Sequence, residues 1–84
     1  MTYAVEILRP AQRQLAKLDQ KTQEHIIYSI RALADDPRPS GCKKLSGRSA
    51  WRIRVGDYRV IYEIHDKQLI IVVVTLGNRK DVYR

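Results

Sequence analysis

In the segment Trp51-Arg52-Ile53-Arg54-Val55-Gly56-Asp57-Tyr58-Arg59-Val60-Ile61-Tyr62, apolar residues alternate with arginines before a glycine–aspartate pair, and a second run rich in apolar residues follows it. A repeat of two residues is typical of a β-strand that has one buried face. A Gly-Asp pair between two such runs indicates a tight turn. The sequence therefore predicts a strand over 51–55, a turn, and a second strand over Tyr58–His65, paired as a hairpin.

The chain on the C-terminal side of this hairpin predicts one more strand. His65-Asp66-Lys67-Gln68 is rich in turn residues, and Leu69–Leu76 is apolar at nearly every position. Its β-branched residues favour a strand over a helix at this length. A strand that is apolar on both faces belongs inside a sheet that helices cover on one side. Gly77-Asn78 is expected to end it.

The chain on the N-terminal side predicts a strand and two helices. Tyr3–Leu8 alternates as a strand does, and Pro10 suits the first turn of a helix. Asp19 is an expected N-cap of a second helix, and the prolines after Asp36 end it. The predicted fold class is α+β in the order β-α-α-β-β-β. An N-terminal strand and a helix hairpin precede three antiparallel strands, and the helices pack on one face of a curved sheet.

Composition limits what the chain can be. Its 84 residues, of which 44% are hydrophobic, suit one globular domain spanning 1–84. The longest apolar run has six residues, whereas a membrane helix needs roughly 20. The N-terminus has no secretory pattern. One cysteine with two histidines cannot build a structural zinc site. We therefore expect a cytoplasmic protein without membrane contact, metal or other cofactor.

Charge is concentrated in the C-terminal half. The net charge is +7, but residues 1–42 hold six basic and five acidic residues, whereas residues 43–84 hold ten and four. Such an excess favours a polyanionic partner. Arg52 and Arg54 share one strand face, and the turn register decides whether Arg59 joins them. Unpaired arginines gathered on one face suit phosphate, although salt bridges or plain solvation of that face are the alternative.

Several segments together resemble one family. The hairpin quoted first, Gly77-Asn78-Arg79-Lys80-Asp81-Val82-Tyr83-Arg84, Leu45-Ser46-Gly47 and Arg9-Pro10-Ala11 are similar to the RelE branch of the RelE/ParE toxin superfamily. The likeness covers nearly the whole chain and its element order. An arginine followed four residues later by a tyrosine, at the C-terminus, resembles the RNA-cleaving members more than those that poison DNA gyrase.

This resemblance implies the toxin of a type II toxin–antitoxin system. Such a toxin enters the A site of the 70S ribosome, beside 16S rRNA, and cuts the mRNA there. It implies a cognate antitoxin protein as partner, with a free monomer and a hetero-oligomer when bound. Two alternatives stay open: a non-catalytic ParE-like toxin that inhibits DNA gyrase by protein binding, and a basic module that only binds nucleic acid.

The resemblance also implies a catalytic set, Arg52, Arg54, Arg59, Arg79 and Tyr83. Relatives often have lysines at the first two positions, and many have histidine where this chain has Asn78. Cleavage by 2′-hydroxyl attack needs a base, an acid and stabilisation of charge on phosphorus. Tyr83 is the remaining candidate base, because nearby guanidiniums would lower its pKa from about 10.

We also predict roles for other basic, histidine and aromatic residues. The further RNA-binding residues that we predict are Lys43, Lys44, Arg48, Lys80 and Arg84. His25 and His65 are expected to be a helix-surface residue and a turn residue. We expect core packing, rather than base stacking, for the aromatic residues Trp51, Tyr58, Tyr62, Tyr28 and Tyr3.

Overall fold

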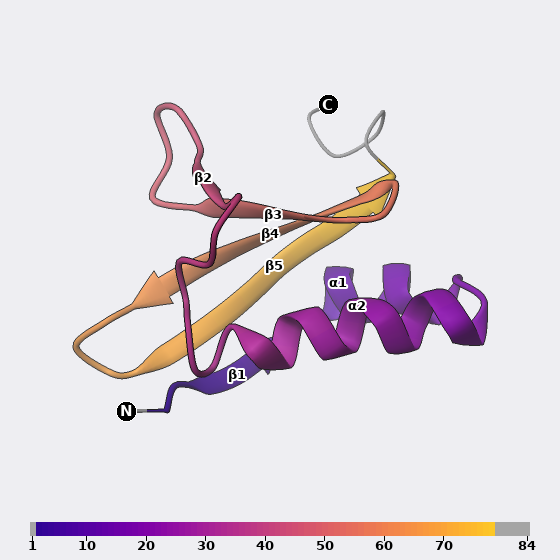
Figure 1. Cartoon of the computed structure of the whole chain (residues 1–84), viewed down its shortest axis with the longest axis horizontal. Helices are drawn as coiled ribbons and strands as arrows, with labels where there is room; N and C mark the ends of the chain where they lie inside the picture. The colour runs from indigo at the N-terminus through magenta and orange to yellow at the C-terminus, as the bar shows by residue number, and fades with distance from the viewer. Residues whose placement is uncertain (1, 79–84) are drawn as a thin grey trace.

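The computed structural model describes residues 2–78, and within them the chain forms two helices and five strands (Figure 1). The elements in chain order are β1 (Ala4–Ile7), α1 (Arg9–Ala16), α2 (Gln20–Ala32), β2 (Lys43–Lys44), β3 (Trp51–Val55), β4 (Tyr58–His65) and β5 (Ile70–Asn78). The predicted order of elements is confirmed, with one short strand, β2, added before the hairpin. In this part of the chain no helix is long and apolar enough to cross a membrane.

The strands form one mixed sheet in the order β1-β5-β4-β3-β2. β1 runs parallel to β5, and the other neighbouring strands run antiparallel. In the predicted hairpin, β4 is therefore the central strand of the sheet, and β3 lies between β4 and the edge strand β2. β5 lies inside the sheet, as its apolar sequence predicts.

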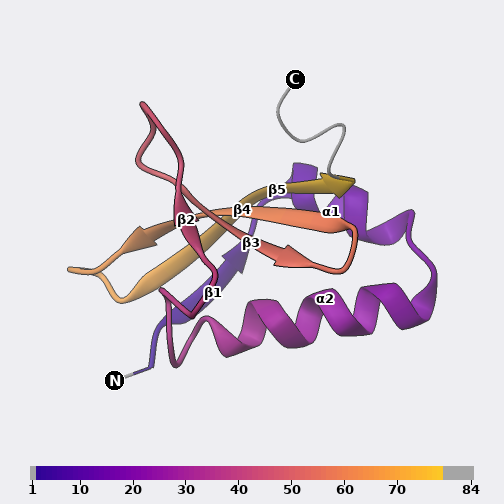
Figure 2. The same cartoon turned by 45° about the horizontal axis from the view of Figure 1, so that its top comes forward.

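Both helices begin where their capping residues predict. Pro10 occupies the first turn of α1, where a missing N–H costs no hydrogen bond. Asp19 caps α2, because its carboxylate accepts hydrogen bonds from the Thr22 backbone N–H at 3.2 Å and the Thr22 hydroxyl at 2.6 Å. Figure 2 shows α2 lying along one side of the sheet.

One hydrophobic core joins the helices to one face of the sheet. The buried residues of the two helices pack in the same cluster as alternate residues of β3, β4 and β5. The helix side contributes Ala11, Leu15, Ile26 and Ile30, with Leu33 at the end of α2, and the sheet side contributes Ile53, Val55, Val60, Tyr62, Ile71, Val73 and Leu76. The helices therefore leave the opposite face of the sheet uncovered.

Three local predictions were wrong. Gly77-Asn78 does not end the last strand, because both residues pair with β4, opposite Arg59 and Tyr58. Cross-strand pairing here outweighs the weak strand preference of glycine and asparagine. No strand was predicted between the second helix and Trp51, yet Lys43 and Lys44 form the short strand β2 and pair with β3. Tyr28 lies on the outer side of α2 with 75% of its surface exposed, and not in the core.

A polar cluster fastens the link between α2 and β2 to the sheet. The Arg38 guanidinium forms an ion pair with Asp66 at 3.0 Å and lies 5.1 Å from the centre of the Trp51 ring. The Tyr3 hydroxyl donates to the other Asp66 oxygen at 2.6 Å. The buried Tyr62 hydroxyl donates to the Pro37 carbonyl at 2.7 Å. Side chains from β3, β4 and the β4–β5 turn thus hold this link, and Tyr3, just before β1, holds Asp66.

Asp66 should give the fold an acid-sensitive element. The hydrogen bond from Arg38, with that from Tyr3, lowers the pKa of Asp66 below its usual value near 4. A carboxylate with a lowered pKa stabilises the fold above that usual value, and its contribution is lost as the pH falls through the folded-state pKa. We expect Asp66→Asn to lower Tm at pH 7, and the difference from the wild type to shrink as the pH falls through the folded-state pKa of Asp66.

Thermal unfolding monitored by circular dichroism between pH 2.5 and 7 measures this difference. Asp35→Asn serves as the matched control, because Asp35 is exposed and belongs to the same link. A gap in Tm between wild type and Asp66→Asn that is the same at every pH would contradict the assigned role of the carboxylate.

Candidate nucleic-acid interface

The turn between β3 and β4 fixes which arginines meet. Val55 pairs with Tyr58, so Gly56 and Asp57 alone form the loop. Gly56 has a φ of 60°, which glycine adopts without the strain that a side chain would add. A two-residue loop with glycine first is a preferred hairpin turn. It sets the register in which Arg54 lies directly opposite Arg59.

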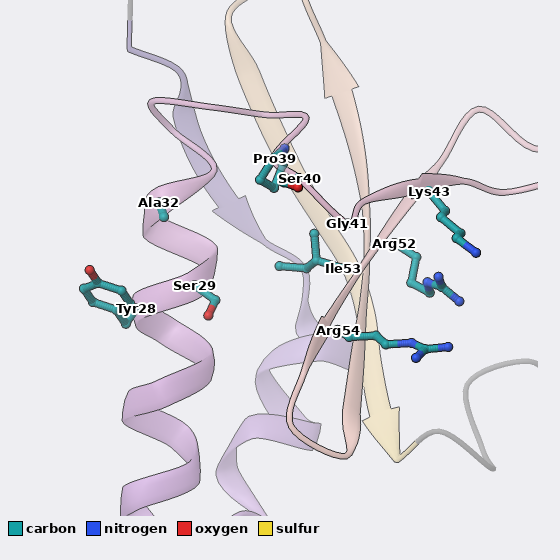
Figure 3. Close-up of a pocket in the computed structure, with 10 residues that line it drawn as sticks. All are labelled: Tyr28, Ser29, Ala32, Pro39, Ser40, Gly41, Lys43, Arg52, Ile53 and Arg54. Carbon is teal, nitrogen blue, oxygen red and sulfur yellow. The ribbon is translucent and has the colours of Figure 1, made fainter.

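Four cations share the face of the sheet that the helices leave uncovered. Arg52 pairs with Lys43, and Arg54 pairs with Arg59. Residues paired directly across antiparallel strands point to the same side. Their neighbours Ile53, Val55 and Val60 point into the core. Figure 3 shows the side chains of Lys43, Arg52 and Arg54 directed away from α2. We call Lys43, Arg52, Arg54 and Arg59 the cationic face.

The four side chains differ in their exposure to solvent. Arg54 and Lys43 are exposed, Arg59 is half-buried, and Arg52 keeps only 9% of its surface accessible. Arg52 lies between Lys43 on one side and Ile61 on the other in the sheet. The expectation that both Arg52 and Arg54 stand open on this face is therefore wrong for Arg52.

Arg59 has an unusual neighbour on its other side. Its partner on β5 is Gly77, which has no side chain to cover the guanidinium. Arg54 has open space on its outer side, because the pairing of β2 with β3 ends at Arg52. In the described part of the chain, residues 2–78, no carboxylate forms an ion pair with Arg54. Arg54 and Lys43 are thus the accessible members of the cationic face, and Arg59 lies half-buried beside Arg54.

A hollow of about 490 Å³ lies between α2, the link that follows it, and β3. Tyr28 and Ala32 of α2 line one side, Pro39 and Gly41 of the link line its end, and Ile53 of β3 lines its floor (Figure 3). Arg52 and Arg54 form its opposite margin.

The remaining predicted RNA-binding residues lie elsewhere or cannot be placed. Lys44 pairs with Trp51, so it points to the opposite side from Lys43. Arg48 is exposed in the loop between β2 and β3. Four predicted site residues lie outside the described residues: Arg79, Lys80, Tyr83 and Arg84. Gly77, which sequence reasoning took only as a strand breaker, is the neighbour of Arg59 that it missed.

The histidines do not join the cationic face. His25 is exposed on α2, as expected. His65 ends β4, with its Nε2 3.0 Å from the Glu63 carboxylate. His65 lies six residue positions beyond Arg59 along β4, which corresponds to about 20 Å of extended strand. Among residues 2–78 no three histidine, cysteine, aspartate or glutamate side chains gather as metal ligands would.

The geometry suits binding of phosphate groups. Two guanidiniums directly opposite each other repel, and an anion between them removes that repulsion. Arginine offers two parallel N–H donors to phosphate oxygens. A flat, uncovered sheet surface can accept an extended strand of nucleic acid.

Comparison with known proteins identifies the family of the chain. The sequence model described as the ParE toxin of the type II toxin–antitoxin system parDE matches residues 5–83. A RelE-like toxin protein of Escherichia coli is 31% identical over 99% of this chain and 92% of its own length. Toxin RelG of Mycobacterium tuberculosis is 28% identical over 100% of this chain and 99% of its own.

Solved structures give the same result for the fold. The chain is similar to one in an archaeal RelE–RelB complex from Pyrococcus horikoshii, with a TM-score of 0.85, 30% identity, and coverage of 98% of this chain and 100% of that one. A chain of the RelBE2 toxin–antitoxin complex from Mycobacterium tuberculosis gives a TM-score of 0.85 at 25% identity, covering 96% and 95%. This protein therefore belongs to the RelE/ParE superfamily of type II toxin–antitoxin toxins, in its RelE-like branch.

Proposed function

We propose that this toxin is a ribosome-dependent endoribonuclease that cuts mRNA in the ribosomal A site. The observation that carries the proposal is the pairing of the exposed Arg54 directly opposite Arg59, on the sheet face that the helices leave uncovered. The RelE-like names of the relatives support the same activity. The cut is a 2′-hydroxyl attack on the adjacent phosphate, which releases the 5′ oxygen.

Arg59 is assigned to the scissile phosphate. It is half-buried, with its Nε shielded from solvent, and so less mobile than a surface arginine. Its paired N–H donors would bind the oxygens on which negative charge grows as the 2′ oxygen attacks. Stabilisation by fixed donors of this kind is often the largest single contribution to the rate.

Arg52 has a different role in this proposal than the resemblance implies. With 9% of its surface accessible, it cannot offer its guanidinium fully to RNA. We assign it to the positive potential of the face and to the position of its neighbours. An arginine is in any case a poor proton donor, because its pKa exceeds about 12.

Arg79 and Tyr83 complete the proposed catalytic set. Asn78, the last described residue, pairs with Tyr58 beside the hairpin turn, next to the Arg59–Gly77 pair. We assign the phenol to proton transfer from the 2′ hydroxyl, without a metal ion.

The partners in this proposal are RNA and an antitoxin. Lys43, Lys44 and Arg48 would contact mRNA or 16S rRNA from β2 and the loop that follows it. Similar chains were solved in RelE–RelB and RelBE complexes. We propose that a cognate antitoxin binds this chain as well, and that its acidic residues oppose the net charge of +7.

One finding favours a second candidate function. The matching family model is named for ParE toxins, so a gyrase inhibitor without catalysis is the alternative. Purified toxin is therefore tested in parallel on programmed 70S ribosomes and on DNA gyrase. We expect cleavage of the mRNA within the A-site codon and unchanged DNA supercoiling. Intact mRNA with blocked supercoiling would overturn the proposal in favour of the alternative.

A further inference from the structure

The outward side of α1 carries only basic charge. Arg9, Arg13 and Lys17, the last of which caps the helix, recur every four residues, and all three are exposed. Each lies two positions from Ala11 or Leu15, the buried residues of α1, which is about 200° around a helix of 3.6 residues per turn. The three cations therefore form one row on the side of α1 that points away from the core. We call this row the α1 ridge.

The stability of the helix explains only part of this row. Arg13 and Lys17 lie at the C-terminal end of α1, where a positive charge interacts favourably with the helix dipole. Arg9 is the first residue of the helix, where the same interaction is unfavourable, and the first turn holds no acidic residue. Arg9 and Arg13, four positions apart, also repel each other. Charge placed against the stability of a helix indicates a function outside the fold.

The α1 ridge and the cationic face lie on different sides of the molecule. α1 packs against the core side of β5, whereas the cationic face lies on the opposite side of β2, β3 and β4. The helix and the core therefore separate the two groups of cations. Among residues 2–78, no carboxylate forms an ion pair with any of the three ridge residues. The ridge is thus a second basic surface that the described part of the chain does not neutralise.

The surroundings of the ridge favour a nucleic acid over a protein or a membrane. The other exposed residues of α1 are Gln12 and Gln14, with Pro10 and Ala16 as small apolar ones. Protein interfaces usually have an apolar, aromatic centre, whereas nucleic-acid interfaces are polar and strongly positive. A basic amphipathic helix binds a membrane through its apolar side, and the apolar side of α1 is buried in the core.

The length of the ridge suits a phosphate backbone. From Arg9 to Lys17 the helix rises about 12 Å, and a double-helical nucleic acid such as DNA carries a phosphate for roughly every 3.4 Å of axis on each strand. Resting on the proposed function, which puts the toxin beside 16S rRNA, we infer that the α1 ridge binds the phosphate backbone of ribosomal RNA on the side of the toxin away from the mRNA. The ridge then holds the toxin on the ribosome, and the cationic face is left for the mRNA.

The test measures ribosome binding separately from cleavage. Arg9→Gln/Lys17→Gln removes two charges from the ridge. Arg31→Gln/Lys67→Gln, at exposed positions of α2 and the β4–β5 turn, is the matched control, because each variant loses one arginine and one lysine. Binding to vacant 70S ribosomes, measured by sedimentation, should be about 2- to 30-fold weaker for the ridge variant, the range for two exposed charge contacts. The control should bind as the wild type does.

Salt dependence, cleavage and stability give further readouts. The slope of the logarithm of the binding constant against the logarithm of salt concentration should fall by roughly 1.5 for the ridge variant, at about 0.7 to 0.9 for each lost phosphate contact. Its cleavage rate at saturating toxin should equal that of the wild type. Arg9→Gln alone should leave Tm unchanged or raise it, because it removes an unfavourable charge from the first turn, and should still weaken ribosome binding. Unfolding cannot produce that combination.

The outcomes separate this inference from the proposed function. Equal ribosome binding by the ridge variant and the control would overturn the inference and leave the endoribonuclease in place. Poly-L-glutamate serves as a protein-like polyanion: weaker binding of it by the ridge variant, with unchanged ribosome binding, would overturn the inference in favour of an acidic protein partner. Ribosome binding that depends on the ridge, without any cut in the mRNA, would support the inference and overturn the proposed function.

Discussion

Arg59→Ala is expected to lower the rate of mRNA cleavage on the ribosome by about 10²- to 10³-fold, the usual loss when one fixed donor to a developing oxyanion is removed. The guanidinium is half-buried and lies between Arg54 and Gly77, so solvent cannot replace its geometry. Arg59→Lys should recover only part of the rate, because an ammonium cannot form two parallel bonds to phosphate. Single-turnover cleavage of a defined A-site mRNA measures these rates.

Controls separate this loss from unfolding and from weaker RNA binding. Arg31→Ala removes a charge of the same kind on α2 and should leave the rate unchanged. The Arg59 variants should unfold within a few degrees of the wild type, because Arg59 lies outside the hydrophobic core. If Arg59→Ala cleaves as fast as Arg31→Ala at saturating ribosome concentration, Arg59 does not contact the reacting phosphate.

The second large effect is expected for Tyr83→Phe. If the phenol takes the proton from the 2′ hydroxyl, its loss should slow cleavage by about 10²- to 10⁴-fold, the contribution of a positioned general base. The wild-type rate should rise with pH as the phenolate forms, whereas the small residual rate of Tyr83→Phe should lack that rise. Rates between pH 6 and 9 on the same ribosomal complex give both quantities.

This pH profile keeps catalysis distinct from other roles of the ring. A tyrosine that only stacks on RNA would be replaced well by phenylalanine, and the pH dependence would not change. A rate for Tyr83→Phe within twofold of the wild type would show that the phenol takes no part in the mechanism. The arginines would then remain as the residues that stabilise the developing charge.

The fold could largely be predicted because its signals are local. Alternation around Gly56-Asp57 gives the hairpin, and Asp19 and Pro10 mark the helix starts. The failures arose where pairing partners decide the outcome. Gly77-Asn78 continues β5 because β4 extends alongside it, and the Lys43–Lys44 strand exists only because β3 lies beside it. No composition rule within these short segments carries that information.

The sequence predicted which arginines share a face of the sheet, but not how exposed each of them is. The period of two gave the shared face of Arg52 and Arg54, and the turn register added Arg59. The burial of Arg52 could not be predicted, because its neighbours in space, such as Lys43 and Ile61, flank it only after the sheet has formed. Tyr28 was misplaced for a related reason, because its apolar ring suggested the core while its position on α2 points it outward.

The central claim is that the cationic face promotes attack by the 2′ hydroxyl on an mRNA phosphate in the A site. Its most direct test is the chemistry of the ends produced when the purified toxin cuts a defined mRNA on 70S ribosomes. The account predicts a cut inside the A-site codon that leaves a 2′,3′-cyclic phosphate upstream and a 5′-hydroxyl downstream. A 5′-phosphate with a free 3′-hydroxyl, or cuts that ignore the A-site codon, would contradict it.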